Sequence, residues 1–591
     1  MCGIIGYCGK QAAAPIAFES LKRVEYRGYD SAGISTLDNG QIQVRKGIGK
    51  LDAVENDTHM SSLTGNIAIG HTRWATHGGV TIANAHPHFD CSRTISVVHN
   101  GTIENYQELR KELAANGHEL LSDTDTEVIP HLLEDELKTG RSLKEAVLNT
   151  AAKLEGSYAF LAIAHIEPDK IVGIRKESPL AIGICDIGSF AGSDALVFPE
   201  YVDKLYPLAD NELVIMMQDK VEFFNSAGEK LQKDTININV REQAADKQGY
   251  EFFMLKEILE QPQSLENAVA QNKEHFHSIA LDILRAGQVI VTACGTSRYA
   301  ALVGRYLFSS VGRKFCDVVM ASEFGYFADS VDKNTIVLAI SQSGETADVI
   351  EGVKKAKAAG AQIISIINRP MSMLSDLSDR VILLNCGPEL CVAATKSFLS
   401  QLVVFYLLSY SMVNAFDEAV NTLRELKGEI TQAIEWNNES LKKLCHYLKD
   451  KKDFYYIARG INFAIASEGA LKIKEISYIH AEGMPAGELK HGTLALIEQD
   501  TPVVVISPND YTYRETLSNA IEAKSRGAYI IAISDKENEI YDFWVRIPSV
   551  DELLYPIITV VPLQLLAYHM AVTLGFDPDK PRNLAKSVTV K

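Results

Sequence analysis

Positive charge is scarce in this chain. Its 591 residues include 58 lysines and arginines against 76 aspartates and glutamates, which leaves a formal net charge of −18. Nucleic acids and acidic membranes are bound through basic surfaces, so we expect neither as a partner. A phosphate group bound by this protein should therefore belong to a small molecule in a defined pocket.

Paired cysteines are also missing. The nine cysteines are scattered, odd in number and without a C-x-x-C pair, which argues against a disulfide framework or a zinc ribbon. No basic stretch followed by an apolar run opens the chain, so we expect no secretory signal. Together these features predict a cytoplasmic protein.

Long uninterrupted hydrophobic runs are absent as well. The two most apolar stretches span residues 398–413 and 553–575; the first is short and carries Gln401, and the second contains Pro556 and Pro562. A membrane-spanning helix needs about 20 consecutive apolar residues. We therefore expect two helices buried in the core or in a subunit interface.

The chain is long enough for three or four domains. Residues 2–241 combine short alternating runs, such as 94–99, with helical patterns at 107–116 and 125–138, which predicts layered β-sheets with helices. A polar stretch at 242–250 is the best linker candidate. Beyond it, strands, glycine turns and helices alternate, as they do in parallel α/β sheets.

This second part of the chain contains a duplication. Gly295 and Gly460 each follow the first strand of a repeat, and Glu323 and Glu488 each come 28 residues later. We predict two tandem domains of one flavodoxin-like, parallel-sheet fold, with a crevice between them that could hold a site. The expected bounds are 251–425, 426–580 and a C-terminal tail at 581–591.

The residue after the initiator methionine is Cys2. Removal of Met1 would leave a thiol and a free α-amine on one residue. An α-amine has an unperturbed pKa of about 7.7–8.0, so it could act as the base that activates the thiol. The alternative is a small buried apolar residue, which is what most free cysteines are.

A loop rich in hydroxyl groups follows one strand of the first repeat. Residues 341–346, SQSGET, precede a helix expected near Ala347, where hydroxyls and helix N-terminal N–H groups can hold a phosphate. The alternative is a helix cap without a ligand. The matching loop of the second repeat carries Asp510, which would repel a phosphate. Another hydroxyl turn, at 294–297, is not a G-x-G-x-x-G motif, so no nicotinamide cofactor is expected.

Five histidines gather in one segment of the front part: His71, His77, His86, His88 and His99. Their His-x-His spacing is compatible with zinc. The same segments hold Arg73, Asn84 and Asn100, which suit an amide and a carboxylate better than a metal ion. We predict no metal site and no organic cofactor.

The motifs of the front part together resemble the class II glutamine amidotransferases, in which the N-terminal residue is the nucleophile. They are CGI at Cys2, EYRGYDSAG at 25–33, HTRWATHG at 71–78, NAHPH at 84–88, HNG at 99–101 and DTDTEV at 123–128. The duplicated part resembles the paired sugar-isomerase (SIS) domains of the glucosamine-6-phosphate synthases. Its motifs are CGTS at 294–297, SQSGETAD at 341–348, ATKSF at 394–398, KEISYIHAE at 474–482, GELKHG at 487–492 and PRNLAKSVTVK at 581–591.

This resemblance implies an αββα four-layer glutaminase sandwich followed by two SIS domains. It implies that Cys2 attacks glutamine to give a glutamyl thioester and ammonia, with Asn100 and Gly101 as the oxyanion hole. The other implied roles are Arg73 for the glutamine α-carboxylate, Asp125 for its α-ammonium, Thr76, His77 and His86 as pocket lining, Arg27 as support for Cys2, and Trp74 as the ammonia gate.

For the duplicated part, the resemblance implies fructose 6-phosphate as the substrate. Lys586 would form a Schiff base, Glu475 would move a proton from C1 to C2, and His491 of a neighbouring subunit would open the sugar ring. The residues implied to bind the sugar phosphate are Thr296, Ser297, Ser341, Gln342, Ser343, Thr346, Val392 and Lys472. Without the resemblance, Lys472 and Glu475 would be an ordinary i, i+3 pair on a helix surface.

Two departures from the family motifs leave the ketose open: Ala394 stands in place of a usual serine, and Thr493 in place of a proline. The implied reaction yields glucosamine 6-phosphate and glutamate, in a homodimer. One alternative is an amidotransferase of the same architecture that acts on another ketose phosphate. Another is a sugar-phosphate-binding regulatory protein, which would need a DNA-binding module, and the sequence shows no helix-turn-helix pattern.

Overall fold

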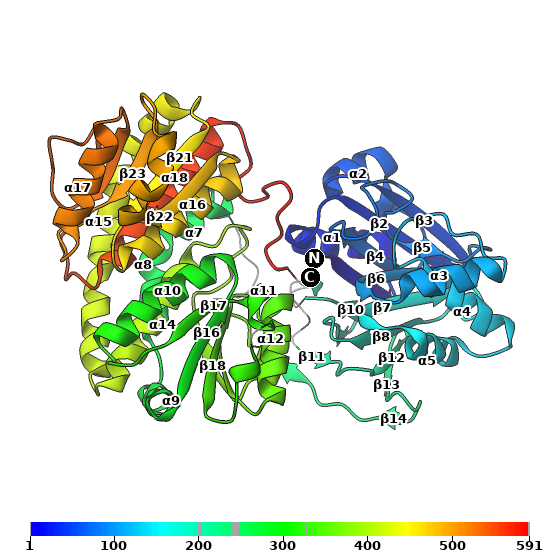
Figure 1. The fold of residues 1–591 in the computed structure, drawn as a ribbon. Helices are drawn as coiled ribbons and strands as arrows, with labels where there is room; N and C mark the ends of the chain where they lie inside the picture. Colours follow the sequence, from blue (N-terminus) through cyan, green and yellow to red (C-terminus); the bar gives the residue numbers. More distant parts are fainter. Residues whose placement is uncertain are drawn as a thin grey trace. The chain divides into compact units, whose positions relative to one another are not determined.

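The computed structural model describes residues 2–194, 197–198, 202, 204–237, 247–326, 328–370 and 372–588. The chain divides into two compact units (Figure 1): the front unit, Met1–Ala245 with Ala585–Lys591, and the rear unit, Asp246–Leu584. Most of the expected linker at 242–250 lies outside the described residues, which resume at Lys247.

The front unit is built on two antiparallel β-sheets, with strand orders β15-β11-β9-β10-β1-β4-β2-β3 and β14-β13-β12-β8-β7-β6-β5. The strands of the first sheet are β1 (Gly3–Gly9), β2 (Ser31–Asp38), β3 (Gln41–Ile48), β4 (Ile67–Arg73), β9 (Ala181–Cys185), β10 (Gly188–Gly192), β11 (Lys204–Pro207) and β15 (Ile236–Asn237). Those of the second are β5 (His88–Phe89), β6 (Ile95–Ile103), β7 (Gly156–Ala164), β8 (Ile171–Lys176), β12 (Leu213–Met216), β13 (Val221–Phe224) and β14 (Lys230–Leu231).

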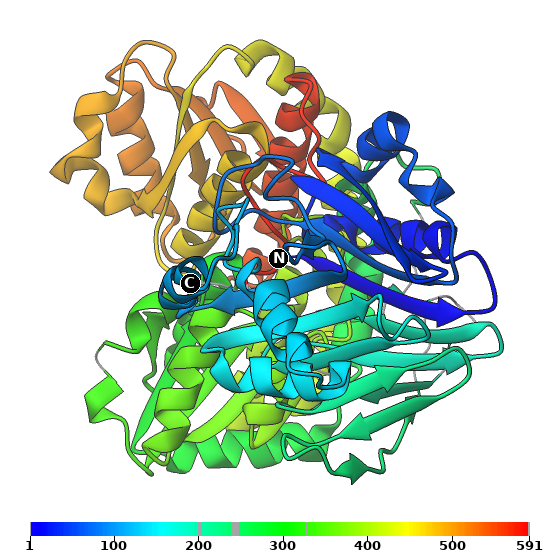
Figure 2. The same ribbon diagram turned by 90° about the vertical axis from the view of Figure 1, so that its right-hand side faces the viewer.

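Alternating side chains of these strands build two apolar layers, because successive residues of a strand point to opposite faces. Along β7, Leu161 and Ile163 pack against the first sheet, whereas Phe160 and Ala162 pack against helices. These helices are α3 (Tyr106–Ala115), α4 (Val128–Lys138) and α5 (Leu143–Lys153); α1 (Ala13–Val24) and α2 (Leu51–Thr58) lie against the first sheet. The front unit is therefore the expected αββα sandwich, and Figure 2 shows its sheets between helices.

The strand expected at 94–99 and the helix expected at 107–116 are confirmed as β6 and α3. The helix expected from residue 125 begins only at Val128, because the carboxylates before it bind backbone N–H groups. Asp125 accepts from Ile103 at 2.8 Å, and Glu127 accepts from residues 121 and 122 at 2.7 and 2.8 Å. These bonds fix an ordered turn ahead of α4.

The rear unit repeats one sheet topology, with strand orders β17-β16-β18-β19-β20 and β22-β21-β23-β24-β25, all parallel. The first sheet comprises β16 (Gln288–Ala293), β17 (Asp317–Met320), β18 (Thr335–Ser341), β19 (Gln362–Ile367) and β20 (Arg380–Leu383). The second comprises β21 (Asp453–Ala458), β22 (His480–Pro485), β23 (Pro502–Ile506), β24 (Tyr529–Ser534) and β25 (Phe543–Arg546). Each sheet has the flavodoxin-like order 2-1-3-4-5, so the predicted duplication is confirmed.

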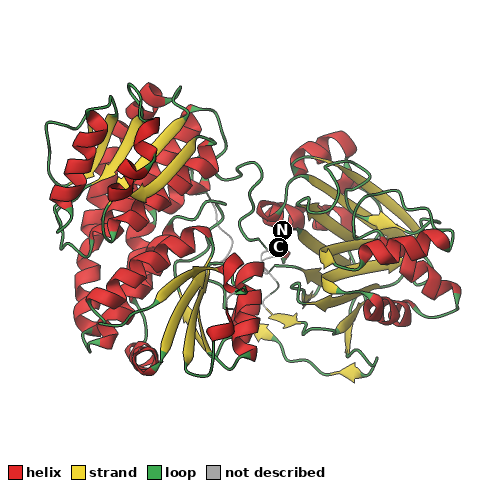
Figure 3. Ribbon diagram, viewed as in Figure 1, coloured by secondary structure: helices red, strands yellow, loops and turns green. Residues whose placement is uncertain are grey.

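Helices cover both faces of these parallel sheets (Figure 3). Along β18, Leu338 packs into one apolar layer and Val337 into the opposite one. The helices with the first sheet are α7 (Phe253–Leu259), α8 (Gln261–Val269), α9 (Lys273–Arg285), α10 (Gly295–Ser310), α11 (Ala321–Phe324), α12 (Ala347–Ala358), α13 (Met373–Leu377) and α14 (Lys396–Met412). Those that follow are α15 (Phe416–Leu448), α16 (Asn462–Ser477), α17 (Tyr513–Lys524) and α18 (Tyr555–Thr573).

The two apolar stretches noted in the sequence are the helices α14 and α18. By length and composition α18 could cross a membrane, but 89% of its apolar window is buried inside the unit. It packs on α15 and α16 in the core that joins both sheets, which explains why it is apolar on every side.

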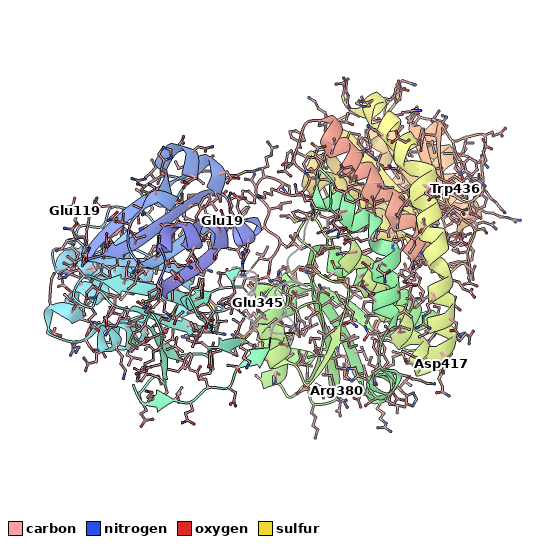
Figure 4. The ribbon with its side chains drawn as sticks, turned by 180° about the vertical axis from the view of Figure 1, so that it is seen from behind. Glu19, Glu119, Glu345, Arg380, Asp417 and Trp436 are labelled. Atoms are coloured by element: carbon pink, nitrogen blue, oxygen red, sulfur yellow. The ribbon has the colours of Figure 1, made fainter. Side chains whose placement is uncertain are left out.

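The 33-residue helix α15 was not expected from the sequence. The expected domain boundary at 425/426 falls within it. Figure 4 labels Trp436 on α15, and the Arg546 guanidinium lies 4.1 Å from the centroid of its ring.

Candidate active sites

Cys2 precedes β1, a central strand of the first sheet, which pairs with β10 on one side and β4 on the other. The backbone N–H of Trp74 donates to Cys2 Sγ at 3.2 Å, and the thiol lies 3.6 Å from the carbonyl oxygen of the same residue. No side chain fits at Gly3, because a Cβ there would lie 2.7 Å from Val24 Cγ2. The backbone of Trp74 thus fixes the position of the half-buried Cys2 thiol.

Asn100 and Gly101 lie next to each other on β6, and Asn100 contacts Cys2. Asn100 Nδ2 donates to the carbonyl oxygen of Cys2 at 2.9 Å, and its buried Oδ1 has no hydrogen-bond partner among the described residues. Gly101 has a φ of +126°, and a Cβ on it would lie 2.1 Å from the carbonyl oxygen of Ser157. Only glycine fits this backbone position.

Arg73 ends β4 and is only 3% exposed. Its guanidinium donates to the three carbonyl oxygens of residues 77–79 at 2.6–3.2 Å. Burial lowers the pKa of Arg73, while the charges of Cys2, Asp30 and Asp125 act in the opposite direction. A buried guanidinium beside carboxylates gives this pocket both signs of charge, which suits a small zwitterion.

Four of the five histidines form a buried network with the turn before α4. His86 Nε2 and His99 Nδ1 meet Thr126 Oγ1 at 3.0 and 2.9 Å, and His88 Nε2 meets Thr124 Oγ1 at 3.1 Å. Burial lowers the pKa of all three imidazoles. Neutral rings bonded to two threonines therefore hold the turn that carries Asp125.

His71 completes this network from β4. Its ring stacks on His86 with 4.0 Å between the centroids, and its Nε2 donates to the carbonyl oxygen of His99 at 3.0 Å. Burial lowers the pKa of His71 to about 3. The imidazole is thus an uncharged packing element.

Three predicted residues lie at the outer side of the pocket. Trp74 is half-buried, packed edge-to-face on Tyr29 with 5.8 Å between the ring centroids. Thr76 is exposed, and His77 packs edge-to-face on Tyr106. These groups can contact a ligand without being part of the core.

Arg27 is buried on the other side of β1. It donates to Asp194 Oδ2 at 2.8 Å and to the carbonyl oxygen of Ser193 at 2.9 Å. Ser193 Oγ accepts from the N–H of Ile4 at 3.0 Å. Through Ser193, Arg27 braces the strand that begins next to Cys2.

The loop from Ser341 to Thr346 joins β18 to α12 as expected. Its hydroxyls bond to one another, Ser341 Oγ to Thr346 Oγ1 at 2.8 Å, and Ser343 Oγ accepts from the Glu345 N–H at 3.2 Å. Thr346 is the N-cap residue of α12 but makes no side-chain cap bond. Gly344 has φ +70°, and a Cβ would lie 2.0 Å from Ser372 Oγ. The loop gathers hydroxyls at a helix N-terminus without using them as a cap.

The matching loop of the second repeat is occupied by its own carboxylate. Asp510 accepts from the N–H and Oγ1 of Thr512 at 2.8 and 2.7 Å and from Asn462 Nδ2 at 2.8 Å. These donors neighbour the N-terminus of α17 and the turn after β21. An anion would meet a carboxylate here, whereas the first repeat offers hydroxyls.

A buried charge cluster connects α10 with α16. Lys472 is fully buried, and its Nζ lies 2.5 Å from Glu475 Oε2, 2.9 Å from Thr296 Oγ1 and 3.5 Å from Glu468 Oε1. The two carboxylates raise the pKa of Lys472 despite its burial, which pulls the other way. Burial raises the pKa of Glu468 to about 8. Lys472 and Glu475 are therefore not the surface pair that their spacing alone suggested.

The other predicted residues of the sugar site are more dispersed. Ser297 Oγ accepts from Gln401 Nε2 at 3.0 Å, Gln342 accepts through its carbonyl oxygen from the N–H of residue 368 at 3.0 Å, and half-buried Val392 donates its N–H to Asp579 at 3.1 Å. His491 is exposed on the 3₁₀ turn Ala486–His491. Lys586 groups with the front unit, so its place beside Glu475 stays a prediction.

Some residues that complete these sites were missed in the sequence. Glu468 lies one helical turn before Lys472, and the i, i+4 spacing on a predicted helix was a signal that could have found it. Thr126 lies within the DTDTEV motif, from which only Asp125 had been assigned. Asp194 gave no local signal, because it meets Arg27 only through folding.

Comparison with known proteins identifies both units. The glutamine amidotransferase domain family matches residues 71–186, and the SIS domain family matches twice, at 282–410 and 447–574. Glutamine–fructose-6-phosphate aminotransferase (isomerizing) of Thermococcus kodakarensis is 47% identical and that of Pyrococcus horikoshii 44% identical, each over 100% of both chains.

A solved structure agrees with the fold of the rear unit. The C-terminal domain of glucosamine-fructose-6-phosphate aminotransferase from Francisella tularensis has a TM-score of 0.54 and 32% identity, covering 57% of this chain and 100% of that one. Identity along the full length, a glutaminase-type sandwich and two SIS domains lead to one conclusion. The chain belongs to the family of isomerizing glutamine–fructose-6-phosphate aminotransferases.

Proposed function

We propose that this protein transfers the amide nitrogen of glutamine to fructose 6-phosphate and isomerises the product, which yields glucosamine 6-phosphate and glutamate. The observation that carries the proposal is the thiol of Cys2 beside Asn100 and Gly101. Family membership and the hydroxyl loop at 341–346 support the sugar phosphate as acceptor.

In the first half-reaction, removal of Met1 frees the α-amine of Cys2, which takes the thiol proton. The thiolate attacks the side-chain carbonyl carbon of glutamine, and the carbonyl oxygen becomes an oxyanion. Asn100 Nδ2 and the N–H of Gly101 stabilise this charge; an amide nitrogen carries two hydrogens, so Asn100 can keep its bond to Cys2. The proton held by the α-amine leaves with ammonia, and water then releases glutamate from the thioester.

Glutamine is held at its α-carbon by opposite charges. Arg73 has five N–H donors, and three bonds go to the loop at 77–79, so donors are left for the α-carboxylate. Asp125 Oδ2 accepts from Ile103, and its other oxygen serves the α-ammonium. Thr76, His77 and His86 line the pocket.

In the second half-reaction, the phosphate of fructose 6-phosphate binds Ser341, Ser343 and Thr346, and His491 opens the ring. The C2 carbonyl condenses with the amine of Lys586 and loses water, and ammonia then displaces the lysine to leave an imine at C2. Glu475 removes the proton from C1 to give an enaminol, and protonation at C2 with loss of the C1 hydroxyl proton completes the amino-aldose. Lys472 Nζ lies 2.5 Å from Glu475 Oε2 and holds this carboxylate in position.

We also propose a cytoplasmic homodimer. All nine cysteines are free thiols, as a reducing compartment favours. The apolar surface of α18 is buried inside the rear unit, so this helix gives no argument for a dimer. The argument comes from His491, which is exposed and therefore suited to reach the sugar bound by a second copy. Sedimentation equilibrium should give twice the chain mass; a monomer with full activity would remove this role of His491.

The test of the reaction compares nitrogen donors. Wild type should form glucosamine 6-phosphate from fructose 6-phosphate with glutamine or with ammonium, whereas Cys2→Ala should do so with ammonium only. Cys185→Ala is the matched control, because it removes another partly buried thiol of the front unit. No glucosamine 6-phosphate from wild type would refute the substrate, and glutamine-dependent synthesis by Cys2→Ala would refute the nucleophile.

A further inference from the structure

Four side chains of metal-ligand type converge in the front unit, apart from the glutamine pocket. Cys91 follows β5, His118 follows α3, and His131 and Glu134 lie one turn apart on α4. One ligand atom from each lies within 4.8 Å of those of the other three. Three of the side chains are buried, and Cys91 is exposed, so the cluster is accessible from solvent. Glu119, next to His118, is labelled at the periphery of the unit in Figure 4.

Four of the six distances between these ligand atoms are close to those of a tetrahedral zinc site. Cys91 Sγ lies 3.5 Å from Nδ1 of both His118 and His131, and Glu134 Oε2 lies 3.2 and 3.6 Å from the same two nitrogens. Zinc bonds of about 2.3 Å to sulfur and about 2.0–2.2 Å to nitrogen and oxygen put tetrahedral ligand atoms roughly 3.3–3.6 Å apart. Three of these four edges fall in that range, and the fourth, from Glu134 to His118, is 0.1 Å shorter than its lower limit.

The outer hydrogen bonds orient the ligand lone pairs toward the centre. His118 Nε2 lies 2.9 Å from Asp135 Oδ1, so this nitrogen carries a proton and donates it outward. In the tautomer with the proton on Nε2, Nδ1 presents a lone pair to Glu134 Oε2, and a proton or a metal cation between these two acceptors removes their repulsion. A carboxylate behind a histidine ligand is the arrangement that tunes most metal-bound imidazoles.

The second imidazole has no such outer hydrogen bond within the described part of the chain. His131 is 1% exposed, and its Nε2 has no hydrogen-bond partner among the described residues, so the polar contacts of the ring lie on the Nδ1 side. A proton shared by His118 and Glu134 would relieve that pair alone. The Cys91 thiol can likewise donate to one imidazole at a time, whereas a single cation would be bound by all four ligand atoms at once.

We propose that Cys91, His118, His131 and Glu134 bind one Zn²⁺ ion in a closed structural site. Protein atoms fill all four positions, which leaves none for a reacting water. The ion joins the segment after β5, the segment after α3 and α4. The turn that carries Asp125 lies between His118 and His131, so the site stabilises one wall of the glutamine pocket. The expectation of no metal site rests on the histidines at 71–99, whereas this cluster is assembled from three separate segments of the chain.

The test uses the full chain without a polyhistidine tag, exposed to zinc and dialysed against metal-free buffer. Elemental analysis should give about one zinc per chain for wild type and for the control Cys185→Ser, which loses a thiol elsewhere in the unit. In competition with a chromogenic chelator, Cys91→Ser and His131→Gln should bind zinc at least about tenfold more weakly. Cys91 is exposed, so Cys91→Ser should fold, as circular dichroism can verify.

Cobalt gives a second readout that does not depend on activity. Co²⁺ should produce the visible bands of tetrahedral geometry and a thiolate charge-transfer band, and Cys91→Ser should lose the latter. Removal of the metal should lower the unfolding temperature of wild type by clearly more than that of Cys91→Ser. Zinc content far below one per chain in wild type, or equal affinity in wild type and Cys91→Ser, would overturn the proposal and leave a hydrogen-bonded cluster.

Discussion

Replacing Glu468 by glutamine should stabilise the rear unit, and by clearly more at alkaline pH than at mildly acidic pH. Glu468 is fully buried on α16, where its Oε1 accepts from Thr296 at 3.2 Å and lies 3.5 Å from Lys472 Nζ. Lys472 is nearer to Glu475, at 2.5 Å, so its charge compensates that carboxylate first. Burial therefore raises the pKa of Glu468 to about 8, against the opposite pull of Lys472.

The sign and size of the effect follow from proton linkage. A carboxyl group whose pKa rises from 4.5 to about 8 on folding stabilises the folded state fully below pH 4.5, and this stability is lost as the pH rises toward 8. Between pH 6 and pH 9 the loss amounts to about 2–3 kcal/mol. A glutamine side chain has nearly the same shape as a protonated glutamate and has no proton to lose, so the Glu468→Gln variant avoids this loss of stability.

Differential scanning calorimetry at both pH values measures this difference. Glu468→Gln should unfold above wild type at both pH values, and the difference in unfolding temperature should be roughly 3–6 °C larger at pH 9 than at pH 6. Glu539→Gln is the matched control, because that carboxylate is exposed and its removal should give no pH-dependent gap. An equal gap at both pH values would show that Glu468 is not neutral in the folded protein.

Three other changes test separate parts of the molecule. Gly101→Ala should lower glutamine-dependent synthesis at least about 100-fold and spare ammonium-dependent synthesis, because the added Cβ would lie 2.1 Å from the carbonyl oxygen of Ser157. Product assays with each nitrogen donor measure this difference, and equal losses with both donors would contradict the prediction. Ser341→Ala should raise the KM for fructose 6-phosphate about 10–100-fold and leave glutaminase activity unchanged. The substitution removes the hydroxyl that hydrogen-bonds to Thr346 Oγ1 and to the N–H of Gly344. An unchanged KM would disprove phosphate binding at this loop. Burial lowers the pKa of His71 to about 3 in the folded protein. The neutral ring therefore contributes stability that is complete above pH 6.5 and falls as the pH is lowered, by about 2 kcal/mol at pH 5. An unfolding temperature of the front unit that stays constant from pH 7 to pH 5 would contradict this.

Much of the fold could be read from local pattern. The equal spacing from Gly295 to Glu323 and from Gly460 to Glu488 reflects two copies of one strand-helix-strand unit, and the structure has them in the same strand order. The length of α15 could not be read in this way. Its apolar stripe is compatible with two shorter helices, and only packing against α8 and α18 shows that one helix runs through.

The sites were predictable where a motif is local and less so where it is assembled from distant segments. The hydroxyls at 341–346 are neighbours in sequence and in space. The Arg27–Asp194 pair joins residues 167 positions apart, and Cys91 meets His131 across 40 positions, so no spacing rule links them. The start of α4 shifted for a related reason, because Asp125 bonds to Ile103 on β6 rather than to its own helix.

The central claim is that the nitrogen released at Cys2 ends on the sugar. Its most direct test supplies wild-type protein with fructose 6-phosphate, glutamine labelled at the amide nitrogen, and unlabelled ammonium in solution, and then analyses glucosamine 6-phosphate by mass spectrometry. The product formed by wild type should carry mostly the label from glutamine, and Cys2→Ala should give only unlabelled product. Unlabelled product from wild type, or labelled product from Cys2→Ala, would contradict it.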